Sequence, residues 1–188
     1  MRRKRIKRLF TTVGILAVLA LVLTASYQVY LRAVYPLEHE EVVTAYAEQF
    51  ELPPSLIYAV IQTESHFRED AVSSAGAKGL MQLMDGTYEW IQTKLPGDPE
   101  PADRIFEPEV NIRCGCKLLS VLYGQFDNTE TVLAAYNAGI GTVQGWLADG
   151  QYSADGVTLS YIPIEETNTY VKRVLRAQAR YRALYDIK

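Results

Sequence analysis

Glu64 is the residue whose type and position point most directly to chemistry. In segment 53–65, Ile57, Val60, Ile61 and Glu64 follow the i, i+3, i+4, i+7 spacing of one helix face, so this carboxyl belongs to an otherwise apolar stripe. Burial and a position near the C-terminal end of the helix both disfavour the charged form, so we expect the pKa of Glu64 to be raised. A carboxyl group that keeps its proton near neutral pH can act as a general acid. The alternative is an ordinary glutamate whose head group reaches solvent at the helix end.

Three other clusters combine small residues with polar side chains. Residues 73–84 contain two glycines, which let a backbone pass close to a ligand, and Gln82 offers a donor and an acceptor within an apolar run. Tyr136 and Asn137 stand at the end of a predicted helix, and acidic residues open the last one. These clusters are the candidate partners of Glu64.

Helical patterns account for the segments that must position these residues. Pro53 and Pro54 suit the start of the Glu64 helix, and Gly139 suits the end of a later one. No segment of six residues alternates as a half-buried strand does, so we predict an all-α chain. Helices are expected over residues 38–50, 53–65, 79–94, 108–126, 129–137 and 164–187, with loops at 73–78, 95–108 and 150–163 and a short turn or helix at 143–147.

The N-terminal region has the composition of a membrane anchor. Residues 2–8 carry six positive charges, and residues 9–31 contain no charged residue; a helix needs about 20 apolar residues to cross a bilayer core. Basic clusters stay on the cytoplasmic side. We therefore expect a cytoplasmic segment 1–8, a single-pass transmembrane anchor 9–31, a linker 32–37 and one extracytoplasmic domain 38–188.

A cleaved signal peptide is the alternative interpretation of this region. Its apolar part would span about 7–15 residues, which is shorter than the run found here. Thr24-Ala25-Ser26 would serve as the small-residue cleavage site.

Charge and cysteine content exclude several classes of partner. Without the basic N-terminal segment, 13 Lys and Arg face 22 Asp and Glu, a net charge of −9. Such an acidic domain lacks the clustered cations that bind phosphate, so no nucleic acid is expected. Cys114 and Cys116 lie two positions apart in a predicted helix without a nearby histidine, which favours small buried side chains over a disulfide or a metal site. No metal or organic cofactor is expected, and the sequence identifies no protein partner.

The four clusters, in this order, resemble the lytic transglycosylases related to the soluble lytic transglycosylase catalytic domain. The resemblance covers about residues 40–185. It rests on Glu64-Ser65, on Gly76-Ala77-x-Gly79-Leu80-Met81-Gln82, on Ala135-Tyr136-Asn137-Ala138-Gly139, and on Glu166-Thr167 ahead of Tyr170-Val171. It implies a lysozyme-like helical domain with a substrate cleft. It also implies cleavage of the β-1,4 bond between N-acetylmuramic acid and N-acetylglucosamine in peptidoglycan, with formation of a 1,6-anhydro end.

The resemblance also implies roles for individual residues. Glu64 corresponds to the single catalytic acid, and Asn111-Ile112 with Gly115 correspond to the helix that backs the cleft. Contacts to the glycan strand are implied at Ser73, with Ser74 as an adjacent competitor, and at Gln82, Met84, Tyr136, Asn137 and Glu166.

Three of these residues also have simpler interpretations. Tyr136 is equally typical of a packed core, Met84 of a core filler, and Glu166 of an acid that a helix N-terminus favours. The chain departs from the usual family pattern at Asp85-Gly86, near a common proline position, and at Gly139-Ile140-Gly141, where Gly-Pro-Gly is frequent. Two other functions remain open: a goose-type lysozyme-like hydrolase with the same fold, and a non-catalytic wall-binding module.

Overall fold

The computed structural model describes residues 2–187, with side chains from Phe10 onwards, and the chain divides into two compact units after Pro36. The first unit is one helix, α1 (Arg2–Val34), which continues three residues into the predicted linker. Its stretch Phe10–Val34 has a mean hydropathy of 2.0 and is long and apolar enough to cross a membrane by length and composition. Its large apolar side chains from Phe10 to Tyr30 are exposed within the structure. The predicted N-terminal apolar helix is thus confirmed as a helix.

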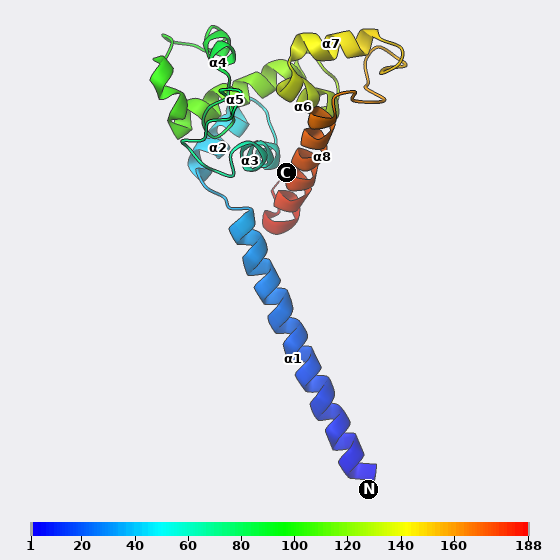
Figure 1. Ribbon diagram of the computed structural model, residues 1–188. Helices are drawn as coiled ribbons and strands as arrows, with labels where there is room; N and C mark the ends of the chain where they lie inside the picture. Colours follow the sequence, from blue (N-terminus) through cyan, green and yellow to red (C-terminus); the bar gives the residue numbers. More distant parts are fainter. Residues whose placement is uncertain (1, 188) are drawn as a thin grey trace. The chain divides into compact units, whose positions relative to one another are not determined.

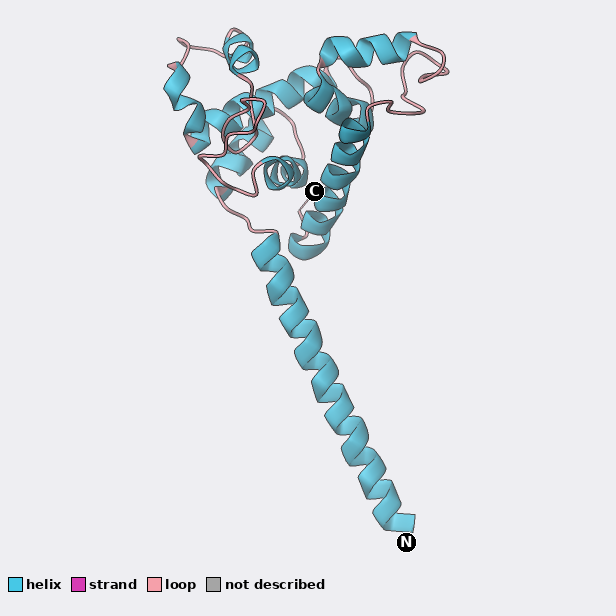
Figure 2. Ribbon diagram, viewed as in Figure 1, coloured by secondary structure: helices cyan, strands magenta, loops and turns pink. Residues whose placement is uncertain are grey.

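The second unit is built from helices and connecting loops (Figures 1 and 2). Among residues 2–187 there is no strand, only two isolated bridges that pair Lys78 with Val72 and Leu83. The prediction of an all-α domain is therefore confirmed. Its elements are α2 (Glu40–Gln49), α3 (Pro54–Glu64), α4 (Asp85–Gln92), a 3-10 helix η1 (Ala102–Phe106), α5 (Pro108–Tyr123), α6 (Thr129–Ala138), α7 (Ile140–Ala148) and α8 (Glu165–Tyr185).

Helix α3 is the buried centre of this unit. Every residue from Ser55 to Ile61 is buried. Apart from Ser55, the side chains of this segment are largely apolar around the whole helix, so it offers no polar face to solvent. Pro54 occupies the first turn, where its missing N–H costs nothing. Figure 1 views α3 along its axis, and it packs against α2 and α8. On the α8 side, the Tyr58 ring stacks on Tyr181 with 5.2 Å between the centroids.

The helix predicted over 79–94 is wrong in its first part, because α4 begins only at Asp85. Gly79 and Gln82 have φ angles of 74° and 48°, in the left-handed region that no right-handed helix can contain. The Gln82 amide also donates to the carbonyl oxygens of Ala71 and Gly79, at 3.1 and 2.9 Å, and so competes with helical bonding. Residues 71–83 therefore form a compact loop, called here the 71–83 loop.

Smaller differences concern the ends of elements. The predicted loop 95–108 contains the 3-10 helix η1, and α5 ends at Tyr123 rather than three residues later. The short element expected at 143–147 is a full helix, α7. Gly139, with a φ angle of 90°, forms the sharp junction that separates α6 from α7.

Candidate active site

Glu64 is the last residue of α3 and its side chain is half-buried. Val60 and Ile61, one turn earlier, are fully buried, so the apolar stripe predicted from the sequence does carry the carboxyl into the protein. Burial raises the pKa of Glu64 from 4.5 to about 7, while the nearby Tyr170 hydroxyl and the positive charge of Arg173 oppose the rise. The structure therefore shifts the pKa of Glu64 in the direction expected from the sequence.

The Glu64 carboxyl faces a pocket of about 330 Å³ formed where the ends of three helices meet. Helix α3 supplies its C-terminal end, α6 its C-terminal end and α8 its N-terminal turns. The Thr167 hydroxyl joins two of these elements by donating to Asn137 Oδ1 at 2.8 Å. This pocket, the Glu64 pocket, is lined by Thr63, Glu64, Asn137, Glu165, Glu166, Thr169, Tyr170 and Arg173.

Two tyrosines lie beside Glu64. Tyr170 is buried, its hydroxyl forms no hydrogen bond of ordinary length with any described residue, and the charge of Glu64 acts on it. Tyr136 is half-buried and donates its hydroxyl to the Met81 carbonyl oxygen at 2.8 Å. Burial, followed by the nearby charge of Glu64, raises the pKa of both phenols well above the ordinary value. Both tyrosines are therefore neutral hydrogen-bond donors under all ordinary conditions.

The Met81 peptide ties the 71–83 loop to the helices around the site. Its N–H donates to Asn111 Oδ1 at 2.7 Å, and its carbonyl oxygen accepts the Tyr136 bond. The Asn111 amide also donates to the carbonyl oxygens of Lys78 and Ile105, at 3.1 and 2.7 Å. Asn111 is fully buried with these bonds satisfied, so α5 holds the loop in one conformation.

Two glycines make this close packing feasible. A Cβ atom on Gly79 would collide with the Asn111 side chain, and one on Gly115 would collide with the Met81 side chain. Gly79 and Gly115 thus serve close approach between the 71–83 loop and α5, whereas a Cβ atom on Gly76 would meet nothing within 4 Å.

Of the six residues predicted to contact substrate, the structure brings two to the Glu64 pocket and leaves four outside. Asn137 and Glu166 line it together with Glu64. The remaining predicted contacts, Ser73, Gln82, Met84 and Tyr136, are not among its lining residues.

Ser73 and Gln82 have structural bonds in the 71–83 loop. The Ser73 hydroxyl accepts a bond from the Ala77 N–H at 3.0 Å, and both Gln82 amide bonds go to loop carbonyl oxygens. Met84 is 45% exposed at the start of α4, so it is not a core filler. The substrate contacts of Ser73, Gln82 and Met84 stay predictions.

Tyr136 lines a second pocket instead, which is more apolar than the Glu64 pocket and has a volume of about 290 Å³. Thr87 and Trp90 of α4 form one side of it, and Gly139 and Ile140 form another. Trp90 is 37% exposed there. Tyr136 therefore lies within electrostatic range of the Glu64 carboxyl and lines an apolar pocket that also includes the partly exposed Trp90.

Sequence reasoning missed Thr169, Tyr170 and Arg173 as members of the site. The signal was present: counted from Glu166, they stand at i+3, i+4 and i+7, the spacing of one helix face. Once Glu166 is placed in a cleft, that spacing predicts which other residues of α8 face the same cleft.

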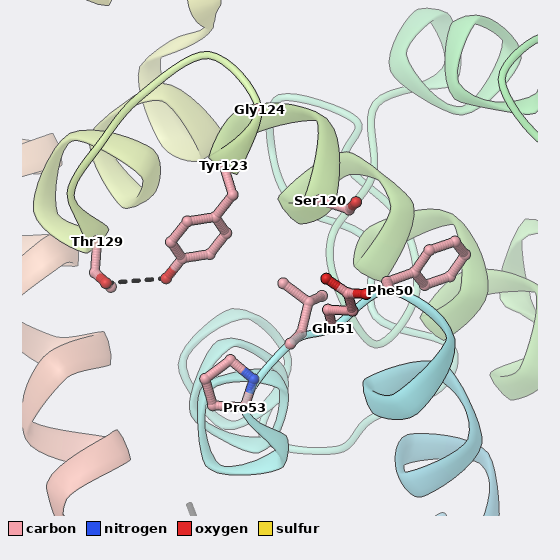
Figure 3. Close-up of a pocket in the computed structure, with 8 residues that line it drawn as sticks. Phe50, Glu51, Pro53, Ser120, Tyr123, Gly124 and Thr129 are labelled. Atoms are coloured by element: carbon pink, nitrogen blue, oxygen red, sulfur yellow. Dashed lines mark hydrogen bonds between the residues drawn. The ribbon is translucent and has the colours of Figure 1, made fainter.

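A separate pocket of about 460 Å³ lies at the other end of α3 (Figure 3). It lies between the connection of α2 to α3 and the C-terminal end of α5, and shares no lining residue with the Glu64 pocket. Glu51 is its one carboxylate, and that side chain is exposed. The pocket with a carboxylate withdrawn from water is therefore the Glu64 pocket at the C-terminal end of α3, and not this separate pocket. Among the described residues, no group of three or more His, Cys, Asp or Glu side chains is arranged to hold a metal ion.

Comparison with known proteins gives one consistent picture. Residues 41–156 match the family model described as "Transglycosylase SLT domain". The soluble lytic murein transglycosylase of Escherichia coli K12 is 37% identical over 152 residues, which are 79% of this chain and 23% of that protein. The membrane-bound lytic murein transglycosylase C of Pectobacterium atrosepticum is 30% identical over 158 residues, covering 72% of this chain and 44% of the relative.

Solved structures agree with this picture. The 70 kDa soluble lytic transglycosylase of E. coli has a TM-score of 0.71 at 33% identity, covering 81% of this chain and 25% of that one. An inactive glutamate-to-glutamine mutant of the Pseudomonas aeruginosa lytic transglycosylase Slt has a TM-score of 0.70 at 33% identity and the same coverage. The chain thus spans about a quarter of the length of these structures.

Proposed function

Since the chain belongs to the family of transglycosylase SLT domains, we propose that it is a membrane-anchored peptidoglycan lytic transglycosylase. The bond cleaved is the β-1,4 link from N-acetylmuramic acid to N-acetylglucosamine, and the product carries a 1,6-anhydro end. The observation that carries this proposal is the Glu64 carboxyl, which has a pKa of about 7 and faces a pocket at the meeting point of three helix ends. The names of the relatives support the same activity, and an inactive mutant of one relative has lost one glutamate.

Glu64 acts first as an acid and then as a base. It donates its proton to the oxygen that links the two sugars, and the bond from C1 of the muramic sugar to that oxygen breaks. The acetamido oxygen of the same sugar stabilises the positive charge at C1. The C6 hydroxyl then attacks C1, its proton passes to the Glu64 carboxylate, and the ring closes. The residue ends in its starting form, and no water is consumed.

The tyrosines and the α8 residues set the properties of this acid. Tyr170 interacts with the carboxylate form, which steadies Glu64 after it has given up its proton. Asn137, held by Thr167, and Glu166 offer polar groups to the hydroxyls and acetamido groups of the strand. A carboxyl with a pKa near 7 suits both halves of the cycle, since neither protonation state is rare at neutral pH.

Product mass separates this function from its closest alternative. Purified peptidoglycan is digested with the full chain in detergent micelles, and the fragments are measured by mass spectrometry. The proposal predicts fragments that are lighter by one water than lysozyme products. Fragments with ordinary reducing ends would make the protein a goose-type lysozyme-like hydrolase.

Glu64→Gln provides the matched control for that digestion. It keeps the size of the side chain and removes the transferable proton, so cleavage is expected to fall by about 100- to 10,000-fold. Undiminished cleavage by this variant would assign the chemistry to another acid. No cleavage by either protein would favour a wall-binding module.

Helix α1 supports the membrane anchor in this proposal. The six positive charges ahead of its apolar stretch favour a cytoplasmic N-terminus, which leaves the catalytic unit on the side where the wall lies. A relative named as membrane-bound is consistent with this location. The full chain is then expected to stay in the membrane fraction after alkaline carbonate extraction, with its N-terminus intact. A mature protein that begins near Ser26 would establish the signal-peptide alternative.

A further inference from the structure

Arg173 brings a positive charge into the Glu64 pocket that the chemistry above does not use. It lies on α8 one turn beyond Tyr170 and lines the same pocket as Glu64, Glu165 and Glu166. It is the one cationic side chain among the lining residues, all of which the structure describes. Its side chain is exposed, so a ligand in the pocket can reach it.

The guanidinium group is not committed to an ion pair within the protein. Among the side chains of residues 10–187, the ion pairs closer than 4.0 Å join other residues, although three carboxylates share its pocket. Two other arginines of the domain, Arg104 and Arg113, both pair with Glu100. Arg176 and Arg180 on α8 also form no ion pair with a described residue, but they do not line the Glu64 pocket. An arginine fork that faces a binding pocket without an internal partner is well suited to a carboxylate, which it can hold through two parallel hydrogen bonds.

The chemistry of the substrate limits what such a fork can bind. The hydroxyl and acetamido groups of a peptidoglycan strand are neutral, so its anionic groups are carboxylates. One source is the lactyl group of the muramic sugar, whose carboxyl is free when no peptide is attached. The other source is the acidic residues of an attached stem peptide. Glu165 and Glu166 also line the pocket, so a bound carboxylate is disfavoured near these two side chains and favoured near Arg173, which restricts the position of the anion.

We propose that Arg173 is a specificity-determining residue that binds a substrate carboxylate next to the cleaved bond. This inference rests on the proposed function. Glycan strands that place a carboxylate beside Glu64 are then bound by Arg173 and cleaved faster than strands without such a carboxylate. The positive charge also keeps an anionic strand from being rejected by the acidic pocket rim.

The test compares the full chain with Arg173→Gln on three substrates: glycan strands freed of peptide, strands with stem peptides, and peptide-free strands whose carboxyls are converted to methylamides. Rates are measured at pH 5.5, where Glu64 is protonated, so that the influence of Arg173 on the Glu64 charge does not contribute. We expect kcat/KM of the variant to fall at least about tenfold on a carboxylate-bearing substrate and to stay unchanged on the methylamide. A loss confined to peptide-free strands identifies the lactyl carboxylate, and one confined to peptide-bearing strands identifies the stem peptide.

An equal loss on all three substrates, or no loss on any, overturns the inference. Arg176→Gln is the matched control, because this exposed arginine lies on the next turn of α8 and is not a lining residue. Arg173→Lys keeps the charge without the fork, so an intermediate loss is expected. Circular dichroism of each variant excludes misfolding as the cause of a lower rate.

A binding measurement separates this inference from the proposed function. The variants Glu64→Gln and Glu64→Gln with Arg173→Gln are compared by calorimetry on the same substrates. Weaker binding of the carboxylate-bearing strand by the double variant supports the role of Arg173 even if the parent protein does not cleave. Equal binding by both variants overturns the proposed role of Arg173, even if the parent protein is an active lytic transglycosylase.

Discussion

Replacing Glu64 by glutamine is expected to make the folded protein more stable at alkaline pH and to change little at acidic pH. The folded state holds this proton with a pKa of about 7, compared with 4.5 for the ordinary side chain. Below pH 4.5 the carboxyl is protonated in both the folded and the unfolded chain. The folded state then bears no cost from the raised pKa of Glu64, and the stability of the protein is fully present. As the pH rises towards 7, the unfolded chain releases the proton more readily, and this stability is lost.

The size of the effect follows from the two pKa values. Each whole pKa step corresponds to about 1.4 kcal/mol. A pKa raised from 4.5 to about 7 therefore costs the folded state about 2–3 kcal/mol above pH 8, since the half-buried side chain keeps some contact with water. Glutamine has nearly the same shape and no acidic proton. The folded Glu64→Gln variant is therefore not destabilised by ionisation of a buried carboxyl at alkaline pH.

Urea unfolding of the full chain in detergent micelles measures the difference. The two tryptophans, Trp90 and Trp146, both lie in the second unit, so their fluorescence reports its unfolding. The free energy of unfolding is compared between wild type and Glu64→Gln from pH 4 to pH 8.5. The exposed Glu130, replaced by glutamine, provides the background for removal of one negative charge.

The reasoning is refuted if the stability difference between Glu64→Gln and wild type is the same at pH 4 and pH 8.5. That result would mean that the carboxyl titrates alike in the folded and the unfolded chain. The mechanism would then have no acid that is protonated at neutral pH.

Three further substitutions test the surroundings of Glu64. Tyr170→Phe removes an interaction that lowers the pKa of Glu64, so the decline of kcat at alkaline pH should move to higher pH; a move to lower pH would contradict the assigned role. Asn111→Ala removes three hydrogen bonds of a fully buried amide and should lower the unfolding free energy by about 3 kcal/mol in urea titrations, whereas a loss under about 1 kcal/mol would show that the 71–83 loop needs no such anchor. Tyr136→Phe frees the Met81 carbonyl and should cost about 1 kcal/mol by the same measurement with the fold retained; an unchanged stability would show that this bond is dispensable.

The position of Glu64 was predictable from the sequence because it depends on local periodicity. The spacing of Ile57, Val60 and Ile61 fixes one face of α3, and that face is buried in the structure. The direction of the pKa change follows from the same burial. Helical content was predictable for the same reason, since amphipathic helices carry their signal within each segment.

The 71–83 loop was not predictable, because its conformation depends on residues far away in the sequence. Asn111 is 30 positions from Met81, and Tyr136 is 55 positions from it, yet both hold its peptide. The residues that follow Gly79, up to Met84, are apolar apart from Gln82, and this local pattern favours a helix that runs through them. The left-handed Gln82 is stabilised by carbonyl oxygens that become acceptors only after the loop has formed.

Membership of the site was predictable only in part. Asn137 and Glu166 lie with Glu64 in one pocket, and the substrate contacts assigned to them and to Ser73, Gln82, Met84 and Tyr136 stay predictions. Thr169, Tyr170 and Arg173 of α8 share a helix face with Glu166, but that spacing identifies site residues only once Glu166 is known to lie in the cleft. The face of α8 that turns towards α3 is set by packing between the two helices.

The pKa of the Glu64 carboxyl itself tests the central claim most directly. Carbon-13 NMR of the carboxyl groups, with the Glu64 signal assigned by its absence in Glu64→Gln, follows this one group through a pH titration. A midpoint near 7 is predicted, because the α3 stripe withdraws the carboxyl from water. A midpoint near 4.5 would contradict the account, since Glu64 would then carry no proton to give at neutral pH.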